Sequence, residues 1–465
     1  MYQHKGDRMD KREISRREFV RRSTQAGIVL AASPYFLHAH SAGAAMQSVA
    51  ASDRVRFGMI GIGMRGSGIL DTCVRLPGVE CVAACDLYDD RHTLANEIIG
   101  KATGKTVPTT RTYQDLLDNK EIDCVVAAVP DHWHRKIVVD ACDAGKDIYC
   151  EKPMTHEVEE GFRIIEAAQK NKRIVQIGSQ RRSSITFAKA RELIRQGAIG
   201  DVHYVQAILG RNSPCGAWVY APPFNLSPQN LDWQTWLGDA PRRPFDPVRF
   251  ARWRAFKDYG EGMPGDLFVH SLTGVHYVMG LDAPPERALS MGGLFHWKDG
   301  REFPDVMTTL YEYPNLRVAV LMTQCTDQEE ITRFLGTRGV IEIQEEGALM
   351  TVAPQDGKDD APCYYETGYP QKMRDAYEKK WHEENDPKPG ATQPAEGTET
   401  YVFPPNYDPV GDHLWNFFQS VRTRQPSVED AVFGNHTSIA CHMANYSYFH
   451  RSAAVWQASR QRITA

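Results

Sequence analysis

The sequence predicts an α/β protein with two domains. A doubly wound parallel sheet comes first, and an α+β domain with a large, mostly antiparallel open sheet follows it. Between residues 53 and 180, short apolar runs alternate with helical patterns, as in a parallel sheet covered by helices on both faces. From residue 181 to 450, strand-like runs follow one another with few helical patterns between them, which favours antiparallel pairing.

The first apolar run, residues 55–60, leads directly into a glycine-rich turn and then into a helical pattern. Its spacing is G-x-G-x-x-G: Gly61 permits a tight turn, Gly63 lets backbone approach a pyrophosphate, and Gly66 lets helix and strand pack closely. The start of the helix adds free N–H groups that favour phosphate. We therefore expect the whole turn to bind a dinucleotide, through Gly61, Ile62, Gly63, Met64, Arg65 and Gly66.

The second apolar run, residues 79–85, ends at Asp86. An acid about 20 residues beyond the glycines can accept hydrogen bonds from the ribose hydroxyls and would repel a 2′-phosphate. Strand, glycine turn, helix, strand and acid together predict a Rossmann domain over residues 53–180, with NAD favoured over NADP.

Two later strands of this domain end in residues that carry chemistry. The run 123–129 ends at Pro130, and the run 147–150 ends at Glu151 and Lys152. In open α/β sheets ligands bind at the carboxyl ends of the strands, so Lys152 could reach both a nicotinamide ring and an alcohol. The alternative is a solvated surface lysine.

The chain begins with a segment typical of export signals. Arg16 and Arg17 precede a short apolar run, and small residues around Ala42 offer a cleavage site, so residues 1–45 are predicted to be a twin-arginine signal peptide. A basic amphipathic helix is the alternative. The apolar run is too short to span a bilayer, and we expect a periplasmic or otherwise exported protein without a membrane span.

Composition limits the possible partners. The net charge of the 465 residues is −5 and is spread along the chain, which does not favour nucleic acid. The ten cysteines form no C-x-x-C pair, so we expect small core residues in place of a disulfide framework, and no metal site. His132 and His134 lack a third ligand at suitable spacing.

The second domain is expected to contain strands within five runs, and its polar stretch 355–400 is expected to be an insertion with a short helix at residues 371–381. The five runs are 202–209, 288–295, 306–313, 316–323 and 331–343.

A glycine-rich loop in this domain leads into a helical pattern that carries Asp266 and His270. Residues four apart share one face of an α-helix, so Asp266 could orient His270 as a general base. Alternatively, Asp266 caps the helix and His270 is a core residue. Arg181, Arg182 and Trp253 are candidate substrate contacts, although tryptophans are as often core residues.

These motifs together resemble the Gfo/Idh/MocA oxidoreductases, whose members include glucose–fructose oxidoreductase and inositol dehydrogenase. The resemblance covers most of the chain after the leader, but not the insertion. It rests on the glycine turn, Pro130-Asp131-His132-Trp133-His134, Gly145-Lys146-Asp147 leading to Glu151-Lys152-Pro153, Gly178-Ser179-Gln180-Arg181-Arg182, and Asp266 with His270.

The resemblance implies that Lys152 and His270 flank the reacting carbon. It further implies that Pro130, His134, Glu151 and Gln180 contact the cofactor, and that the chain forms a dimer or tetramer. Thr273 stands where the family often has an aspartate, so the polar contacts to substrate differ there.

We therefore expect an exported oxidoreductase that moves a hydride between a secondary hydroxyl of a sugar, cyclitol or glycoside and a tightly bound nicotinamide cofactor. Two alternatives stay open. One is an epimerising or glycoside-cleaving enzyme that recycles its NAD, and the other is a non-catalytic sugar-binding protein.

Overall fold

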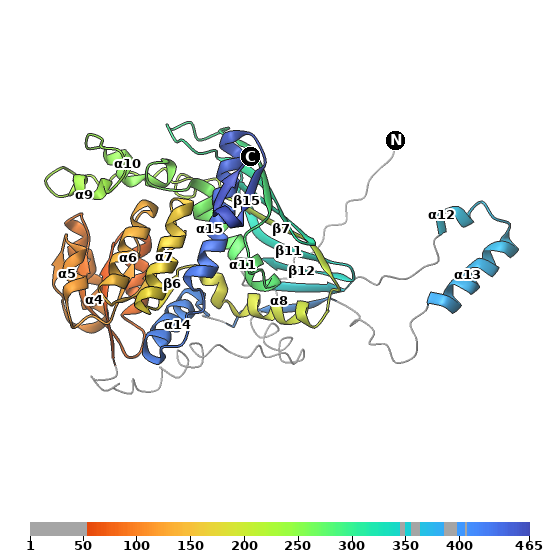
Figure 1. The fold of residues 1–465 in the computed structure, drawn as a ribbon, viewed down its shortest axis with the longest axis horizontal. Coiled ribbons are helices and arrows are strands. Elements are labelled where there is room, and N and C mark those ends of the chain that lie inside the picture. The colour runs from red at the N-terminus through yellow and green to blue at the C-terminus, as the bar shows by residue number, and fades with distance from the viewer. Residues whose placement is uncertain (1–53, 345–348, 355–362, 386–397, 405–406) are drawn as a thin grey trace, which may run out of the picture.

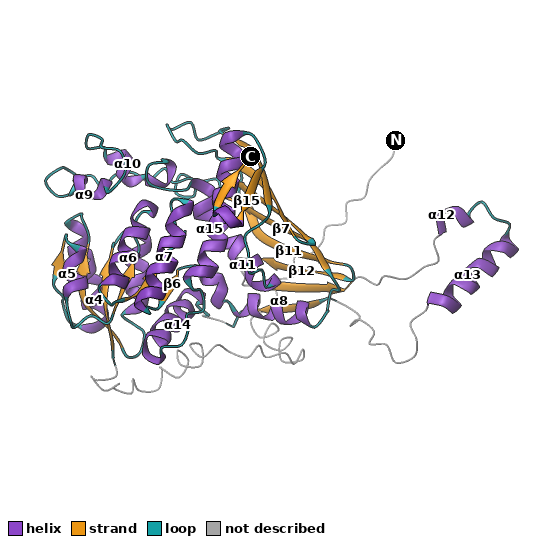
Figure 2. Ribbon diagram, in the orientation of Figure 1, coloured by secondary structure: helices purple, strands orange, loops and turns teal. Residues whose placement is uncertain are grey.

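The computed structural model of the protein describes residues 54–344, 349–354, 363–385, 398–404 and 407–465 (Figure 1). The predicted signal peptide lies outside these residues. Two sheets are connected by a layer of helices, as the colouring by secondary structure shows (Figure 2). Within the described ranges, no helix combines the length and apolarity needed to cross a bilayer.

The first sheet is parallel and has the strand order β3-β2-β1-β4-β5-β6, which is the order of a doubly wound dinucleotide-binding sheet. This confirms the predicted Rossmann architecture. The order reverses between β1 and β4, so the loops that follow these two strands face each other across a crevice. The strands are β1 (Val55–Ile60), β2 (Val79–Cys85), β3 (Thr109–Thr110), β4 (Cys124–Ala127), β5 (Asp147–Cys150) and β6 (Val175–Ile177).

Helices cover both faces of this sheet. One face packs against α3 and α4, and the other against α5, α6 and α7. A helix from the C-terminal part of the chain, α14, joins the first face, where the rings of Phe418 and Phe57 lie 5.6 Å apart. The helices are α3 (Met64–Cys73), α4 (Asp90–Thr103), α5 (Tyr113–Asp118), α6 (His134–Asp143), α7 (Val158–Asn171) and α14 (Pro409–Thr423).

The second sheet has ten described strands in the order β14-β13-β12-β11-β7-β10-β9-β8-β15-β16, and only its β7–β10 pair is parallel. This confirms a mostly antiparallel second sheet. The run expected at 331–343 is two strands, because the chain turns back between Gly336 and Gly339. The strands are β7 (Val202–Gly210), β8 (Arg287–Gly293), β9 (Val306–Tyr313), β10 (Leu316–Thr323), β11 (Gln328–Gly336), β12 (Gly339–Gln344), β13 (Leu349–Pro354), β14 (Glu399–Val402), β15 (Ala454–Gln457) and β16 (Arg462–Thr464).

Three helices, α8 (Ile185–Arg195), α11 (Val269–Met279) and α15 (Ala431–His450), pack on one face of the second sheet. The long helix α15 also contacts α7, so it connects the two sheets (Figure 1). Between β13 and β14 the chain forms α12 (Cys363–Glu366) and α13 (Gln371–Asn385). Two short helices, α9 (Trp233–Leu237) and α10 (Pro247–Ala251), lie in the long connection between β7 and α11.

The close approach of α3 to β1 gives a matched test with two glycines on one helix. A Cβ at Gly66 would lie 2.0 Å from the Gly61 carbonyl oxygen, whereas a Cβ at Gly68 would have no atom within 4 Å. Gly66→Ala is expected to lower the free energy of unfolding by about 1–3 kcal/mol through overpacking. Gly68→Ala should leave it equal or higher by up to ~1 kcal/mol, because alanine favours helix. Urea unfolding measures both, and equal values would contradict the packing argument.

Candidate active site

The glycine turn has the shape that a phosphate group requires. Gly61 has a φ of +83°, and a side chain there would strike the Ala128 carbonyl oxygen. A Cβ at Gly63 would meet nothing within 4 Å, so open space lies beside the backbone just before α3. Open space at a helix N-terminus fits a pyrophosphate. Of the remaining turn residues, Ile62 is buried and Met64 is exposed.

Asp86 ties the end of β2 to this turn. Its carboxylate accepts hydrogen bonds from the backbone N–H of Ile62 at 2.7 Å and of Tyr88 at 2.9 Å. Burial raises the pKa of Asp86 above the usual carboxyl range, although these backbone donors oppose the effect. The partly exposed acid is therefore fixed beside the turn, where a ribose would lie.

Arg65 and Glu151 connect the turn to the end of β5. The Arg65 Nε lies 2.9 Å from Glu151 Oε1, and the buried Tyr149 hydroxyl donates to the same oxygen at 3.4 Å. Both residues are predicted cofactor contacts. The structure pairs them with each other, so their first effect is to hold the β1 and β5 loops together.

Lys152 follows directly and forms the central ion pair of the site. Its Nζ donates to the Asp266 carbonyl oxygen at 2.7 Å and to Asp266 Oδ1 at 2.8 Å. The two side chains are 11% and 16% exposed. Burial opposes ionisation of Asp266, but the Lys152 and Arg254 charges hold its pKa well below the usual carboxyl range. The pair is thus a buried salt bridge between residues 114 positions apart.

His270 lies near this pair but is not oriented by Asp266. The carboxylate of Asp266 is directed at Lys152, Arg254 and Trp218 instead. The reason is a π-helical turn, Pro264–Phe268, which precedes α11 and changes the angle between residues four apart. Burial, and then the charges of Lys152 and Arg181, hold the pKa of His270 well below that of a free imidazole. A neutral imidazole can accept a proton.

The sequence reasoning missed an acid beside the pair, Asp131. It is buried, its Oδ2 accepts from the Glu261 N–H at 3.1 Å, and burial raises its pKa well above the usual range. Glu261 in turn pairs with His442 of α15 at 2.9 Å. Asp131 stands within the Pro130–His134 motif, so its position in the motif was the available signal.

Other predicted cofactor contacts have supporting positions. His134 is fully buried, and its two ring nitrogens contact the carbonyl oxygens of Pro153 at 2.6 Å and Val129 at 3.0 Å. It therefore holds the loops after β4 and β5 together. Pro130 begins the 3₁₀ turn that carries Asp131. Gln180 starts the next 3₁₀ turn, and its buried Oε1 has no protein partner among the described residues.

The predicted substrate contacts separate into two groups. Arg181 forms an ion pair with Glu330, and its charge acts on His270, so it belongs near the site. Arg182 instead stacks on Tyr277 and Phe433, between α11 and α15. Thr273 is fully buried, and the Trp253 ring stacks with the Arg254 guanidinium at 4.2 Å.

A segment between β7 and α11, residues 225–242 and here named the strap, crosses the same edge of the first sheet. One end pairs with the turn after β2, where Asp89 N donates to Asn230 O at 3.0 Å and Asp232 N donates to Leu87 O at 3.1 Å. Its other end meets the start of α6, where the Trp133 indole donates to Trp236 O at 2.9 Å. Because β1 lies between β2 and β4, the strap passes across the edge that holds the glycine turn.

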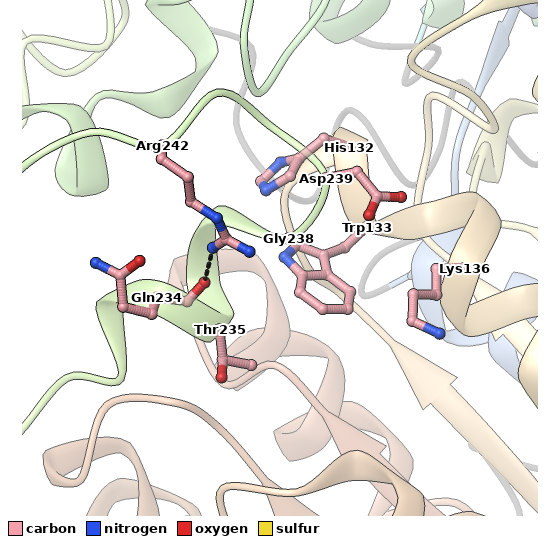
Figure 3. Close-up of a pocket in the computed structure, with 8 residues that line it drawn as sticks. All are labelled: His132, Trp133, Lys136, Gln234, Thr235, Gly238, Asp239 and Arg242. Atoms are coloured by element: carbon pink, nitrogen blue, oxygen red, sulfur yellow. Dashed lines mark hydrogen bonds between the residues drawn. The ribbon is translucent and has the colours of Figure 1, made fainter.

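A cavity of about 410 Å³ lies between the strap and α6 (Figure 3). His132 and Trp133 line it on one side, and Thr235 and Gly238 on the other. Neither Lys152 nor His270 contributes to its wall. The tryptophans of the strap, Trp233 and Trp236, are buried in its own small core together with Tyr88 of the first domain.

The Lys152–Asp266 pair predicts a pH-dependent loss of stability when the acid is neutralised. Asp266→Asn leaves the partly buried ammonium without its counter-charge, so the free energy of unfolding near pH 7 should fall by about 3 kcal/mol. Because the folded-state pKa of Asp266 is lowered, this stabilisation is full above about pH 4 and is lost as the pH falls further.

Urea unfolding at about pH 7 and about pH 3 measures the effect. The control is Asp71→Asn, which removes the exposed Asp71–Arg75 pair and should change stability by less than about 0.5 kcal/mol. A loss at position 266 that is independent of pH would contradict the assignment of the charge.

Two family models match the chain. Residues 55–179 match the GFO/IDH/MocA oxidoreductase family with its NAD-binding Rossmann fold, and residues 218–291 match the C-terminal alpha/beta domain of the same oxidoreductase family.

Similar proteins with assigned names include two curated relatives. Inositol 2-dehydrogenase 3 of Saccharopolyspora erythraea is 35% identical over 148 residues, 31% of this chain and 42% of that protein. A glycosyl hydrolase family 109 protein of a Shewanella species is 29% identical over 212 residues, 42% of this chain and 45% of that protein. The matched region thus spans less than half of each relative.

The fold also matches solved structures. A levoglucosan dehydrogenase in complex with NADH and levoglucosan superposes with a TM-score of 0.63 at 17% identity, over 86% of this chain and 98% of the other. Together, the glycine turn, the two sheets and both family models show that the chain belongs to the GFO/IDH/MocA oxidoreductase family.

Proposed function

We propose that the protein transfers a hydride between a secondary hydroxyl of a sugar, cyclitol or glycoside and a nicotinamide cofactor. The observation that carries this is the position of Lys152. Its amine is held by Asp266 at the carboxyl edge of the first sheet, next to the glycine turn and a neutral His270. The names of the relatives, which act on inositol, levoglucosan or glycosides, support the substrate class.

The residues present fit a bound NAD. Open space at Gly63, the N-terminus of α3 and the fixed carboxylate of Asp86 suit a pyrophosphate and a ribose with free hydroxyls. Gln180 Oε1 is a buried acceptor without a protein partner among the described residues. When bound, NAD supplies the hydride acceptor. The protein then has to hold the alcohol, accept its proton and exclude water.

In this proposal His270 and Lys152 divide the proton transfer. Neutral His270 takes the hydroxyl proton as the carbinol C–H bond breaks. The Lys152 ammonium, which Asp266 fixes in place, stabilises the developing alkoxide. Arg181 adds positive charge nearby. Holding these groups and the alcohol in one geometry supplies a large share of the rate enhancement.

We further propose export through the twin-arginine pathway and a cofactor that stays bound through the catalytic cycle. The leader motif at residues 1–45 supports export, and no NAD pool would replenish a lost cofactor outside the cytoplasm. The strap supports retention, because its two ends are hydrogen-bonded on either side of the glycine turn.

A retained cofactor favours redox-neutral chemistry as a second candidate. In that reaction one carbon is oxidised and later reduced in place, as in epimerisation or in oxidation that eases glycosidic cleavage. The similarity to a glycosyl hydrolase family 109 protein supports this candidate. It predicts deuterium exchange from solvent beside the oxidised carbon, whereas a simple dehydrogenase would release a ketone.

The experiment that tests the proposal uses the purified full chain and the variant Lys152→Ala. Native mass spectrometry should detect bound NAD in both proteins, because Lys152 is not needed for phosphate binding. Reduction of the bound cofactor by inositol, levoglucosan or aryl glycosides should fall by about 10²–10⁴-fold in the variant.

Lys105→Ala is the control, since this exposed lysine pairs only with Glu80 at 3.1 Å among the described contacts. Unaltered turnover in Lys152→Ala would remove Lys152 from the mechanism. A purified protein without nucleotide, active only with added NAD, would overturn retention. Sugar binding without any reduction of the cofactor would instead favour a binding protein.

A further inference from the structure

The carboxylate of Asp266 receives more donors than a lysine partner alone requires. Besides Lys152, the Arg254 Nε donates to Oδ1 at 3.1 Å, and the Trp218 indole N–H donates to Oδ2 at 3.0 Å. Arg254 and Lys152 therefore share one oxygen, while Trp218 holds the other. Neither Arg254 nor Trp218 belongs to a motif that pointed to the site.

Arg254 is held in place from several sides. It is 21% exposed, and its guanidinium stacks on the Trp253 ring at 4.2 Å. The surrounding charged or titratable groups are Asp131 and Glu261 from the loops, Lys152 from the end of β5, and His270 and Arg181 from the second domain. Among them, Asp266 is the carboxylate that Arg254 directly contacts. Its positive charge therefore acts on the same oxygen that binds the Lys152 amine.

Trp218 adopts a strained backbone in order to reach Asp266. Its φ is +61°, a region that side chains other than glycine rarely enter, and the residue is 2% exposed. Strain of this kind persists where the surroundings over-determine it, and it gathers at functional sites. The buried indole gains one directed hydrogen bond, to Asp266 Oδ2.

We propose that Arg254 and Trp218 are positioning residues that fix the Asp266 carboxylate in one orientation and share its negative charge, so that Lys152 can both give up and take up a proton. This rests on the proposed function. An isolated Asp266 would bind the ammonium form of Lys152 alone and hold its proton firmly. A second cation on the same oxygen weakens that hold by competing for the carboxylate and by repelling the ammonium.

The location of Arg254 extends the inference to the cofactor. Arg254 lies in the connection that also carries the strap, 12 residues before Asp266. A displacement of the strap would therefore reach the Lys152–Asp266 pair through Arg254.

Chemical labelling of Lys152 tests the proposal without any substrate. Acetic anhydride transfers an acetyl group to an unprotonated amine and releases acetate, and peptide mass spectrometry gives the rate at each lysine. Arg254→Leu should lower the rate at Lys152 by about tenfold at fixed pH, equal to about 1.4 kcal/mol. Trp218→Phe, which keeps a ring but loses the N–H, should lower it less. Arg254→Lys restores the charge and should return the rate to within about threefold.

Matched controls separate positioning from damage to the fold. Arg252 is also 21% exposed but contacts the Tyr220 carbonyl oxygen and Asp299, so Arg252→Leu should leave the rate at Lys152 unchanged. Trp233→Phe likewise removes an indole donor, to Arg243 O at 2.8 Å, away from Asp266. Lys146, bonded to two backbone carbonyls, is the internal reference lysine.

Equal labelling in native protein and Arg254→Leu would overturn the proposal, and so would equal losses in Arg254→Leu and Arg252→Leu. With a reducing sugar substrate identified, the same variants should lower kcat by ~10- to 100-fold with little change in KM. Absence of turnover on every sugar would count against the proposed function alone, because the labelling result stands without it.

Discussion

The ion pair between Lys152 and Asp266 connects the two halves of the molecule at the place where chemistry is expected. One partner follows β5 of the parallel sheet, and the other lies on the π-helical turn before α11 of the second domain. Their separation of 114 residues means that both domains must fold and dock before the site exists. The surrounding features, from neutral His270 to buried Asp131, take their electrostatic environment from this pair.

The same edge of the sheet is connected twice more, and the three connections reinforce one another. Arg65 and Glu151 join the glycine turn to the end of β5, and the strap joins the turn after β2 to the start of α6. Arg254 then links the strap's part of the chain to Asp266. The geometry therefore couples the region suited to the nucleotide with the residues suited to proton transfer, through direct contacts.

Features with a local physical requirement could be predicted from sequence. The glycine turn and the Lys152 position follow from steric needs and strand ends that a short stretch displays. Long-range features could not. Regular helical spacing suggested that Asp266 orients His270, but a π turn directs it to Lys152. Arg254 and Trp218 lie in a connection without periodic pattern, and the apolar face of α14 did not reveal that it would pack on the first sheet. The export signal and the residue roles stay predictions.

The most direct test of the central claim is a crystal structure of the full chain with NAD. The account predicts a dinucleotide that lies across the carboxyl edge of the first sheet under the strap, with its pyrophosphate at Gly63 and its nicotinamide facing Lys152 and His270. A nicotinamide bound elsewhere, or an amine of Lys152 turned into solvent with Asp266 left to Arg254 alone, would contradict it.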